Sequence, residues 1–409
     1  MTSQTPAPVR FNPFSAEFRH DPYPVYRRLR EARPVHRTMG MWVLTGHAEV
    51  RQVLRDRTFG AGLIPELIDR QARRLAQDDI TTIQHLARKS LVFTDNPDHA
   101  RLRGLVNRVF TAGAVAGLRP LVTEIAEELV GRAWADGGMD AIADLAAPLP
   151  STVMSRWLDL PDELSVQVAQ WTHDIRFLLE PGLMSHADFA HVCHVVQEFA
   201  DRLGSLVAER RSKPGDDLVS SLLAAETVGG DRLSDAEIVF VCMMCFVAGN
   251  ETTKSLIGNG LLALLRHPQQ DALLRDDPGL IPGAVAEMLR YDSPLQQTKR
   301  VATRTVEVSG QLIEQGDQVL LCLGAANRDP ALCDRPEEFD ITRDAQSHLA
   351  FGHGMHGCLG GLLAVLQAEV VFERLYRHAE SLRLDSDNWE WQDQSFIVRG
   401  LTRLPLTVR

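Results

Sequence analysis

The sequence has no excess of positive charge and no hydrophobic run long enough to cross a membrane. Its 409 residues carry 43 Lys and Arg against 54 Asp and Glu, a net charge of −11. Nucleic-acid binding needs a basic surface that neutralises phosphates, so this balance argues against such a partner. The most apolar run, residues 238–249, is too short to span a bilayer, and residues 1–12 contain no signal sequence. We therefore expect a cytoplasmic protein that does not bind a membrane.

Cysteine is scarce, and its spacing suits neither a zinc site nor a disulfide framework. The six cysteines are Cys193, Cys242, Cys245, Cys322, Cys333 and Cys358. Cys242 and Cys245 have C-x-x-C spacing but lie in an apolar helical run, which favours two core residues over a redox pair. Repeats, low-complexity tracts and interdomain linkers are also absent. We expect a reducing compartment and one domain over residues 1–409, with residues 1–20 as a flexible N-terminus.

Hydrophobic periodicity predicts a mainly helical fold with small β-sheets. The expected elements are a proline-started helix over 21–30, a strand over 42–45, helices over 48–54 and 98–210, a loop over 211–217, and strands near 305–308, 318–323 and the C-terminus. Ser234 and Glu237 form a capping box that opens a long helix. Residues 61–90 are arginine-rich and irregular, and we expect a mobile segment with a helical piece. It is either a solvated face or a path for substrate.

Residues 351–360, Phe-Gly-His-Gly-Met-His-Gly-Cys-Leu-Gly, form the most informative motif. Glycines before Cys358 let the backbone approach a flat group and aim N–H groups at the sulfur. An apolar helical run follows, so Cys358 lies just ahead of a helix N-terminus, which favours the thiolate. The alternative is an inert cysteine in a glycine-rich turn. The pattern Phe-Gly-x-Gly-x-His-x-Cys-x-Gly fixes six positions and favours a thiolate presented to haem iron.

At this motif the chain resembles the cytochrome P450 family. The resemblance implies the family's triangular, mainly helical fold with small β-sheets, with haem b between the long central helix and the cysteine-loop helix. It implies Cys358 as the axial ligand of the haem iron, and a thiolate ligand there favours O–O cleavage. The same resemblance assigns haem contacts in the loop to Phe351, Gly352, His356, Cys358 and Gly360.

Residues 248–253, Ala-Gly-Asn-Glu-Thr-Thr, interrupt the long apolar helix. An acid and hydroxyls are unfavourable there, and Gly249 costs about 1 kcal/mol relative to alanine. The alternative is a polar patch that faces solvent. The segment resembles the oxygen-activation motif of the family. The resemblance implies that Thr252 hydrogen-bonds dioxygen, that Glu251 relays protons, and that Ala248 and Gly249 leave room for oxygen beside the iron.

Glu287 and Arg290 share one helix face, because residues three apart in a helix are neighbours. The alternative is an ordinary surface ion pair of little energetic value. The residues that follow, from Arg300 to Pro336 and Phe339, resemble the order found in the family between its ion-pair helix and its cysteine loop. The resemblance therefore implies a structural pair that holds the cysteine loop.

Four cationic or imidazole side chains match the positions that bind the haem propionates in the family. His99 and Arg103 are four apart on one predicted helix, and Arg300 and His356 lie later in the chain. Arginine suits carboxylates because its planar guanidinium donates two parallel hydrogen bonds. Each residue taken alone is an ordinary surface charge, which is the alternative. The resemblance makes the four together the expected propionate site.

The helix after the cysteine departs from the family pattern. Val365 stands where the family usually has an arginine, and Gln367 where it usually has a glutamate. This helix borders the side of the protein that receives electrons, so the usual docking surface for an acidic ferredoxin is in question. Arg101 and Arg108 are expected to be solvated or to face a partner.

The resemblance runs from about Asp21 to the C-terminus and implies a monooxygenase that inserts one atom of O2 by hydroxylation or epoxidation. It implies electrons from NAD(P)H through a ferredoxin and a ferredoxin reductase, a monomeric enzyme, and a role in tailoring a secondary metabolite. The alternatives are an atypical member that performs oxidative coupling, nitration, dehydration or peroxide-driven chemistry, a haem-binding sensor or carrier without turnover, and a helical protein without haem.

The substrate is expected on the side of the haem opposite Cys358. The candidate contacts are Met243, Met244, Phe246, Val247, Leu295, Gln296, Gln297, Phe396 and Ile397. For each apolar residue in this set, core packing is the alternative. The arginine-rich residues 61–90 and Arg399 hint at a polar substrate or one tethered to a carrier protein.

Overall fold

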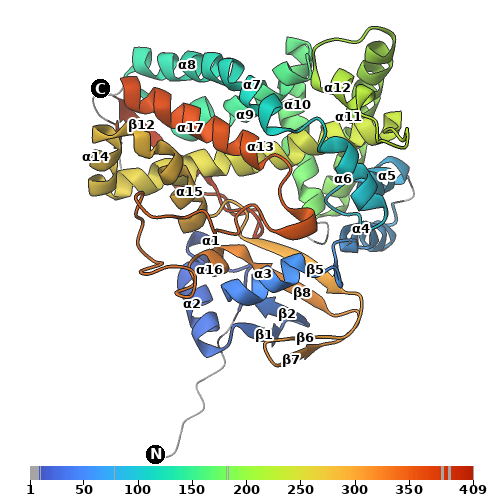
Figure 1. Cartoon of the computed structure of the whole chain (residues 1–409), viewed down its shortest axis with the longest axis horizontal. Coiled ribbons are helices and arrows are strands. Elements are labelled where there is room, and N and C mark those ends of the chain that lie inside the picture. The colour runs from blue at the N-terminus through green and yellow to red at the C-terminus, as the bar shows by residue number, and fades with distance from the viewer. Residues whose placement is uncertain are drawn as a thin grey trace, which may run out of the picture.

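The computed structural model describes residues 9, 11–77, 79–180, 182, 184–378, 382–385 and 388–408. Helices make up most of the molecule, and the largest sheet lies at one end beside the first helices of the chain (Figure 1). The expected mainly helical fold with small β-sheets is confirmed.

Seventeen α-helices are described. They are α1 (Ala16–His20), α2 (Tyr23–Ala32), α3 (His47–Arg55), α4 (Leu63–Arg74), α5 (Thr81–Lys89), α6 (Asp98–Val106), α7 (Ala112–Gly117), α8 (Arg119–Asp136), α9 (Pro148–Trp157), α10 (Asp162–Ile175), α11 (His186–Ser212), α12 (Leu218–Ala224), α13 (Asp235–Arg266), α14 (Pro268–Asp276), α15 (Ile281–Tyr291), α16 (Leu323–Asn327) and α17 (Gly361–His378). Short helical turns add η1 (Ala141–Ala146), η2 (Arg176–Leu179), η4 (Pro278–Leu280) and η5 (Gly354–His356).

The strands form four small sheets. The largest has the order β1 (Val35–Thr38), β2 (Met41–Leu44), β8 (Gln318–Cys322), β5 (Gln297–Ala302) and β3 (Phe59–Gly60). The others pair β4 (Gly138–Asp140), β12 (Pro405–Val408) and β9 (Leu382–Leu384); β6 (Val306–Val308) and β7 (Gln311–Ile313); and β10 (Glu390–Trp391) and β11 (Leu401–Arg403). Among the described strands only β2 and β8 pair in parallel. Their pairing joins the N-terminal region to the segment before the cysteine loop.

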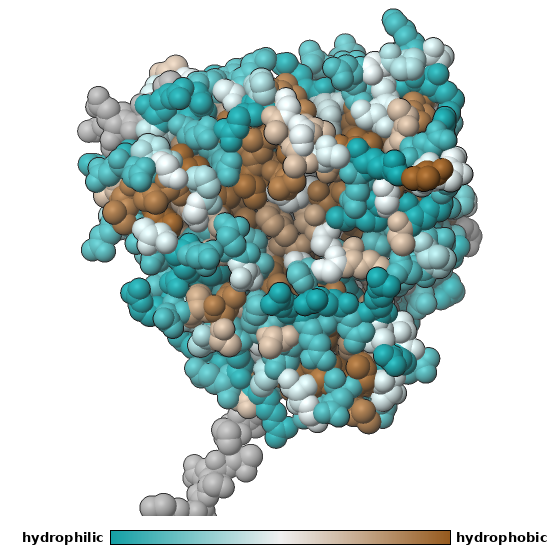
Figure 2. Space-filling model, in the orientation of Figure 1, coloured by the Kyte–Doolittle hydropathy of each residue, from teal (hydrophilic) through white to brown (hydrophobic). Residues whose placement is uncertain are grey.

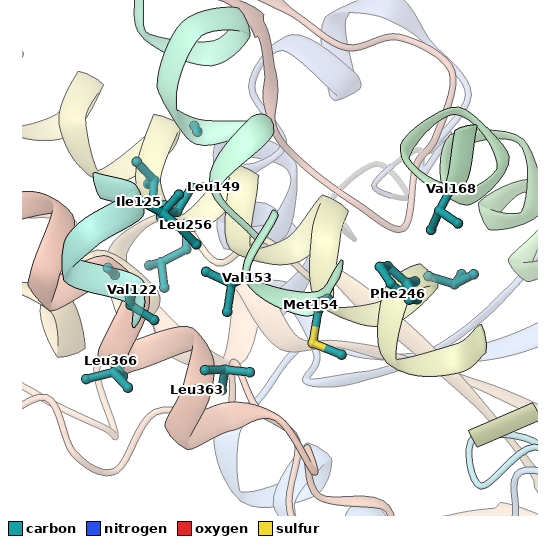
Figure 3. Packing of buried hydrophobic residues seen from close by; sticks show 14 of the residues in the cluster. Val122, Ile125, Leu149, Val153, Met154, Val168, Phe246, Leu256, Leu363 and Leu366 are labelled. Carbon is teal, nitrogen blue, oxygen red and sulfur yellow. The ribbon is translucent and has the colours of Figure 1, made fainter. Parts of the chain in front are cut away.

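The long helix α13 crosses the centre of the molecule, with α17 in front of it in the view of Figure 1. Its predicted capping box is confirmed, since Ser234 Oγ accepts from the N–H of Glu237 at 3.3 Å and Glu237 accepts from the N–H of Ser234 at 2.8 Å. Apolar residues of α8, α9, α10, α13 and α17 pack into one core (Figure 3). By length and composition α13 is apolar enough to span a membrane, but 61% of its most apolar window is buried within the protein, as in the core helix of a globular protein.

Two segments differ from what the sequence predicts. Residues 61–90 contain the expected helical piece but are not irregular, because α4 and α5 are two amphipathic helices that bury Ile68, Ile83 and Leu86 in the main core. Of the predicted flexible residues 1–20, residues 1–8 and 10 lie outside the described part of the chain. From Phe11 onward the chain packs on the protein. Phe11 and Phe18 are 5% and 4% exposed and lie in one hydrophobic cluster with residues of α2.

Candidate active site

The cysteine loop, residues 351–360, follows α16 in the chain, contains η5 and ends at the N-terminus of α17. Its backbone closes on itself, because the N–H of Cys358 donates to the carbonyl of Phe351 at 2.8 Å. Gly354 has a φ of +73°, and a Cβ on it would lie 2.5 Å from the carbonyl oxygen of Leu54. Only glycine fits at that position without moving α3 or the loop.

The Cys358 thiol is accessible to a small molecule although protein surrounds it on most sides. Burial raises its pKa above the ordinary value, and the N–H of Gly360, the charge of Arg103 and the N–H of Gly361 offset only part of this rise. The sequence predicts that the helix N-terminus favours the thiolate, but desolvation is the larger effect. A thiol in this setting becomes a thiolate when a metal cation coordinates it, because coordination displaces the proton.

The central helix is open at the point that faces the thiol. Ala248 is exposed and Gly249 half-buried in the middle of α13, between the buried Val247 and Asn250. A Cβ added at Gly249 would meet no atom within 4 Å. Burial and the nearby Cys358 raise the pKa of Cys245 to about 12, so this turn of α13 lies close to the cysteine loop. Because Ala248 and Cys358 are both exposed on neighbouring segments, we infer a hollow between α13 and Cys358.

Two histidines at the edge of this hollow have no hydrogen-bonding partner in the described part of the chain. The His99 and His356 rings lie 4.3 Å apart between centroids, and none of their four nitrogens makes a hydrogen bond. His99 is 1% exposed, and burial, with the charges of His356 and Arg103, lowers its pKa to about 4. Buried imidazole nitrogens normally make hydrogen bonds, so this pair of touching rings indicates a polar group that belongs beside it.

Arginines complete this rim. Arg103 donates to the carbonyl of Gly357 at 2.9 Å. Arg300 donates to the carbonyl of Lys299 at 2.7 Å and to Thr298 Oγ1 at 3.2 Å, and burial lowers its pKa to about 10. Within the described residues neither guanidinium has a carboxylate within 4.0 Å. A cavity of about 430 Å³, lined in part by His99 and Arg103, opens on this side.

Asp95 supports the rim from behind. Its carboxylate accepts from the N–H groups of Ala61 and Gly62 at about 3.0 Å and lies 3.5 Å from His356 Nε2. Burial would raise the pKa of Asp95, but His356 and the two N–H groups outweigh it and lower the pKa to about 2. The structure thus brings His99, Arg103 and His356 together at one edge, with Arg300 also within the influence of Asp95.

Glu251 is turned away from the hollow and toward α10 and η2. Its carboxylate lies 2.6 Å from Lys254 Nζ, 3.6 Å from His173 Nδ1 and 3.8 Å from Arg176 Nη1. Burial would raise its pKa, but the hydrogen bond with His173 and the charges of Lys254 and Arg176 lower it to about 2. Thr252 Oγ1 donates to the carbonyl of Ala248 at 2.7 Å, which places this hydroxyl on the open turn of α13.

Glu287 and Arg290 form a buried pair, 0% and 1% exposed, with two bonds of 2.6 and 2.8 Å. Arg290 also donates to the carbonyls of Asn327, Pro336 and Glu338 at 2.8 to 3.0 Å. The side chain of Asn327 in turn accepts from the N–H of Leu349, at 2.6 Å, just before the cysteine loop. This network connects α15 to the loop that carries Cys358.

The structure divides the predicted substrate contacts into two groups. Met244, Leu295 and Phe396 are half-buried and reach accessible space. Met243, Phe246, Val247 and Ile397 are at most 8% exposed and pack in the core, and Phe246 is among the core residues of Figure 3. Gln296 donates to the Tyr23 hydroxyl and Gln297 to the Tyr26 hydroxyl. Both amides therefore point toward α2 rather than toward the hollow.

Three charged residues that the sequence does not single out gather beside Phe396. Glu180 accepts from Ser395 Oγ at 2.5 Å and from the N–H of Phe396 at 3.3 Å. Arg176 donates to Gln394 Oε1 at 2.7 Å, and the ammonium of Lys299 lies 5.6 Å from the centroid of the Phe396 ring. No local motif marks these residues, because their partners are far away in the sequence.

Two arginines are also placed differently from expectation. Arg101 is not free in solvent, because it pairs with Glu237 at 3.0 Å and with Asp231 at 3.3 Å. It therefore ties α6 to the start of α13. Arg399 donates to Asp292 Oδ1 at 2.8 Å and to the carbonyls of Arg19 and His20, so it holds the N-terminal region.

Comparisons with known proteins agree with this geometry. A family model for cytochrome P450 matches residues 67–277 and 280–394. The chain is 37% identical to cytochrome P450 107B1 from Saccharopolyspora erythraea, with 99% of this chain and 98% of that protein covered. It is 36% identical to the cytochrome P450 monooxygenase PikC from Streptomyces venezuelae, with 100% and 96% covered. The crystal structure of P450BioI, in complex with an acyl carrier protein ligated to hexadec-9Z-enoic acid, superposes with a TM-score of 0.88 at 33% identity and covers 96% of this chain and 99% of its own.

The family implies haem, a flat group with two carboxylates, and the residues present fit it. The carboxylates would satisfy the unpartnered histidine nitrogens, and the plane would occupy the space that Gly249 leaves open. The matches extend over almost the whole chain. The chain therefore belongs to the cytochrome P450 family, and it is a haem- and O2-dependent monooxygenase.

Proposed function

We propose that the hollow binds haem b, with Cys358 as the axial ligand of the iron and His99, Arg103, Arg300 and His356 around the propionates. The observation that carries this proposal is the contact pair of His99 and His356, whose four ring nitrogens make no hydrogen bond within the described chain, beside an accessible thiol. Haem ligated by a thiolate supplies the oxygen-atom transfer. Two propionates next to these cations would restore the hydrogen bonds that the buried groups lack.

The polypeptide around the haem would control water, protons and position. Thr252 offers a hydroxyl on the open turn of α13, and this hydroxyl donates a hydrogen bond to the carbonyl of Ala248 in the present arrangement. Glu251 is ionised over the whole neutral range because its pKa is about 2. It can accept a proton from solvent only after its contacts with Lys254, His173 and Arg176 lengthen.

The substrate we propose is a mainly apolar biosynthetic intermediate, which the enzyme hydroxylates or epoxidises. Met244, Leu295 and Phe396 offer apolar surface beside the opening. A relative named polyketide biosynthesis cytochrome P450 PksS, and the structure of P450BioI in complex with an acyl carrier protein, support a tailoring role on a polyketide-like or acyl substrate, free or held by a carrier protein. We also propose that the chain works as one domain, as a monomer, in the cytoplasm.

Electrons reach bacterial enzymes of this family through redox partners, and we propose NAD(P)H, a ferredoxin reductase and a ferredoxin here. The ferredoxin would dock beside α17, where Figure 2 shows apolar side chains gathered. Leu362 is 56% exposed and Val365 half-buried, and α7 presents exposed alanines next to them. Gln367 is 3% exposed, so its difference from the family pattern leaves this surface unchanged.

The carbon monoxide difference spectrum of the dithionite-reduced protein tests the proposal. The wild type should give the strongly red-shifted Soret band of thiolate-ligated haem. Cys333→Ser, which changes a half-buried cysteine outside the loop, is the control and should give the same band. Cys358→Ser should lose that band. An unshifted band in the wild type, or a red-shifted band that survives in Cys358→Ser, would contradict the proposal.

A further inference from the structure

Lys299 is half-buried, and its ammonium has no ion-pair partner among the described residues. It lies on β5 and points its ammonium toward the Phe396 ring at 5.6 Å. Across the described ranges of the chain, no carboxylate lies within 4.0 Å of Lys299 Nζ. Burial lowers its pKa, and the more distant Glu180 opposes this only in part. A desolvated ammonium without a counter-ion is costly, so the site is incomplete as it stands.

The nearest acid is already bound by other groups. Glu180, 9% exposed, accepts from Ser395 Oγ and from the N–H of Phe396. These two bonds fix its carboxylate on the C-terminal turn. Burial raises its pKa, with the charges of Lys299 and Arg176 only partly compensating. Glu180 therefore lowers the positive electrostatic potential around Lys299 without forming an ion pair with it.

The neighbouring cation is occupied in the same way. Arg176 donates to Gln394 Oε1 at 2.7 Å and to the carbonyl of His173 at 3.0 Å, and lies 3.8 Å from Glu251. Its guanidinium thus has acceptors from three elements. Among the cations near Phe396, Lys299 is the one whose ammonium makes no hydrogen bond or ion pair with the described residues, so its donors are available to a ligand.

The position of Lys299 in β5 places it next to the active site. Side chains alternate along a strand, and the next residue, Arg300, points toward Asp95 and the rim that we assign to the haem propionates. Lys299 takes the opposite direction, toward Phe396 and the segment that carries Glu180. Its ammonium therefore lies between β5 and that segment, beside the half-buried Phe396.

We propose that Lys299 binds the carboxylate of an amphipathic substrate whose apolar part extends toward the hollow. The proposal rests on the proposed monooxygenase function, whose substrate it describes. The Phe396 ring beside the ammonium, and the burial that lowers the pKa of Lys299, indicate a reduced local dielectric, which strengthens its attraction to an anion. One singly charged carboxylate matches one ammonium, and the apolar neighbours suit an alkyl chain.

Isothermal titration calorimetry of the haem-loaded enzyme tests this, with dodecanoate and dodecanol as probes below their aggregation concentrations. Lys299→Met keeps the length of the side chain and removes the charge, so dodecanoate should bind about tenfold more weakly or worse. Dodecanol affinity should change less than about twofold. Lys299→Arg should restore most dodecanoate binding. Lys213→Met, on an exposed lysine that ends α11, is the matched control and should behave as the wild type.

A second variant tests the sign of the effect. Glu180→Gln keeps the acceptor for Ser395 and Phe396 but removes the opposing charge, so it should tighten dodecanoate binding and leave dodecanol unchanged. Equal losses for both probes in Lys299→Met, unchanged dodecanoate binding, or no dodecanoate binding by the wild type would each overturn the inference. If any of these outcomes is found in protein with an intact thiolate-haem spectrum, the inference about Lys299 is rejected and the proposed function stands. If that spectrum is absent, the proposed function itself is rejected.

Discussion

Replacing Arg290 with lysine should destabilise the protein although it keeps the positive charge. The guanidinium makes five bonds of 2.6 to 3.0 Å, two with Glu287 and three with the carbonyls of Asn327, Pro336 and Glu338. An ammonium has three N–H donors and no planar fork. At least two acceptors in this fully buried site would therefore lose their donor.

The expected loss follows from those two bonds. A buried hydrogen bond to a charged group is worth about 1.5–3 kcal/mol, so Arg290→Lys should cost about 3–6 kcal/mol. The entropy of unfolding near the transition is about 2.1 cal/mol/K per residue, which for 409 residues is about 0.9 kcal/mol/K. The melting temperature should therefore fall by about 3–7 °C.

Calorimetry of the haem-loaded protein measures this, with Arg335→Lys as the control. Arg335 and Glu338 are also three apart and lie 2.7 Å from each other, but their side chains are 66% and 56% exposed. That substitution should change stability by less than about 1 kcal/mol. Arg290 donates to the carbonyl of Asn327, whose side chain holds Leu349 just before the cysteine loop. Arg290→Lys should therefore also reduce the red-shifted carbon monoxide band. The reasoning would be refuted by equal melting temperatures for the two variants.

Three further substitutions test the hollow, the docking surface and the proton path. Gly249→Leu should fold but bind little haem because it fills the space before Cys358, whereas Gly249→Ala should retain haem; equal haem content by absorbance would contradict this. Leu362→Glu should slow reduction by a ferredoxin at least severalfold in stopped-flow measurements, while Leu273→Glu, on a leucine 42% exposed, should not. The pKa of Glu251 is about 2 when folded and about 4.3 when unfolded, so its stabilising effect is complete above that value and is lost as the pH falls toward 2. Urea unfolding should thus separate the wild type from Glu251→Gln at pH 7, and the difference should shrink below about pH 4.

The sequence identifies residues whose positions follow from short-range spacing. The capping box at Ser234, and the placement of His99 and Arg103 on one helix face, can be predicted from helix geometry alone. The glycines around Cys358 need only the conformations that a tight loop demands. The amphipathic helices α4 and α5 are mistaken for irregular chain because arginines crowd their solvent face and hide the apolar stripe that packs on the core.

Long-range contacts decide the rest, and no local pattern contains them. Glu180 and Ser395 are 215 residues apart, and Arg176 and Gln394 are 218 apart. The pKa of Cys358 shows the same limit, since the helix N-terminus is visible in the sequence but the desolvation that outweighs it comes from distant segments. Arg300 and Lys299 are adjacent, yet strand alternation sends one toward the haem rim and the other toward Phe396. A motif can therefore locate the cofactor site while the residues that select the substrate stand beside it, on the opposite face of the same strand.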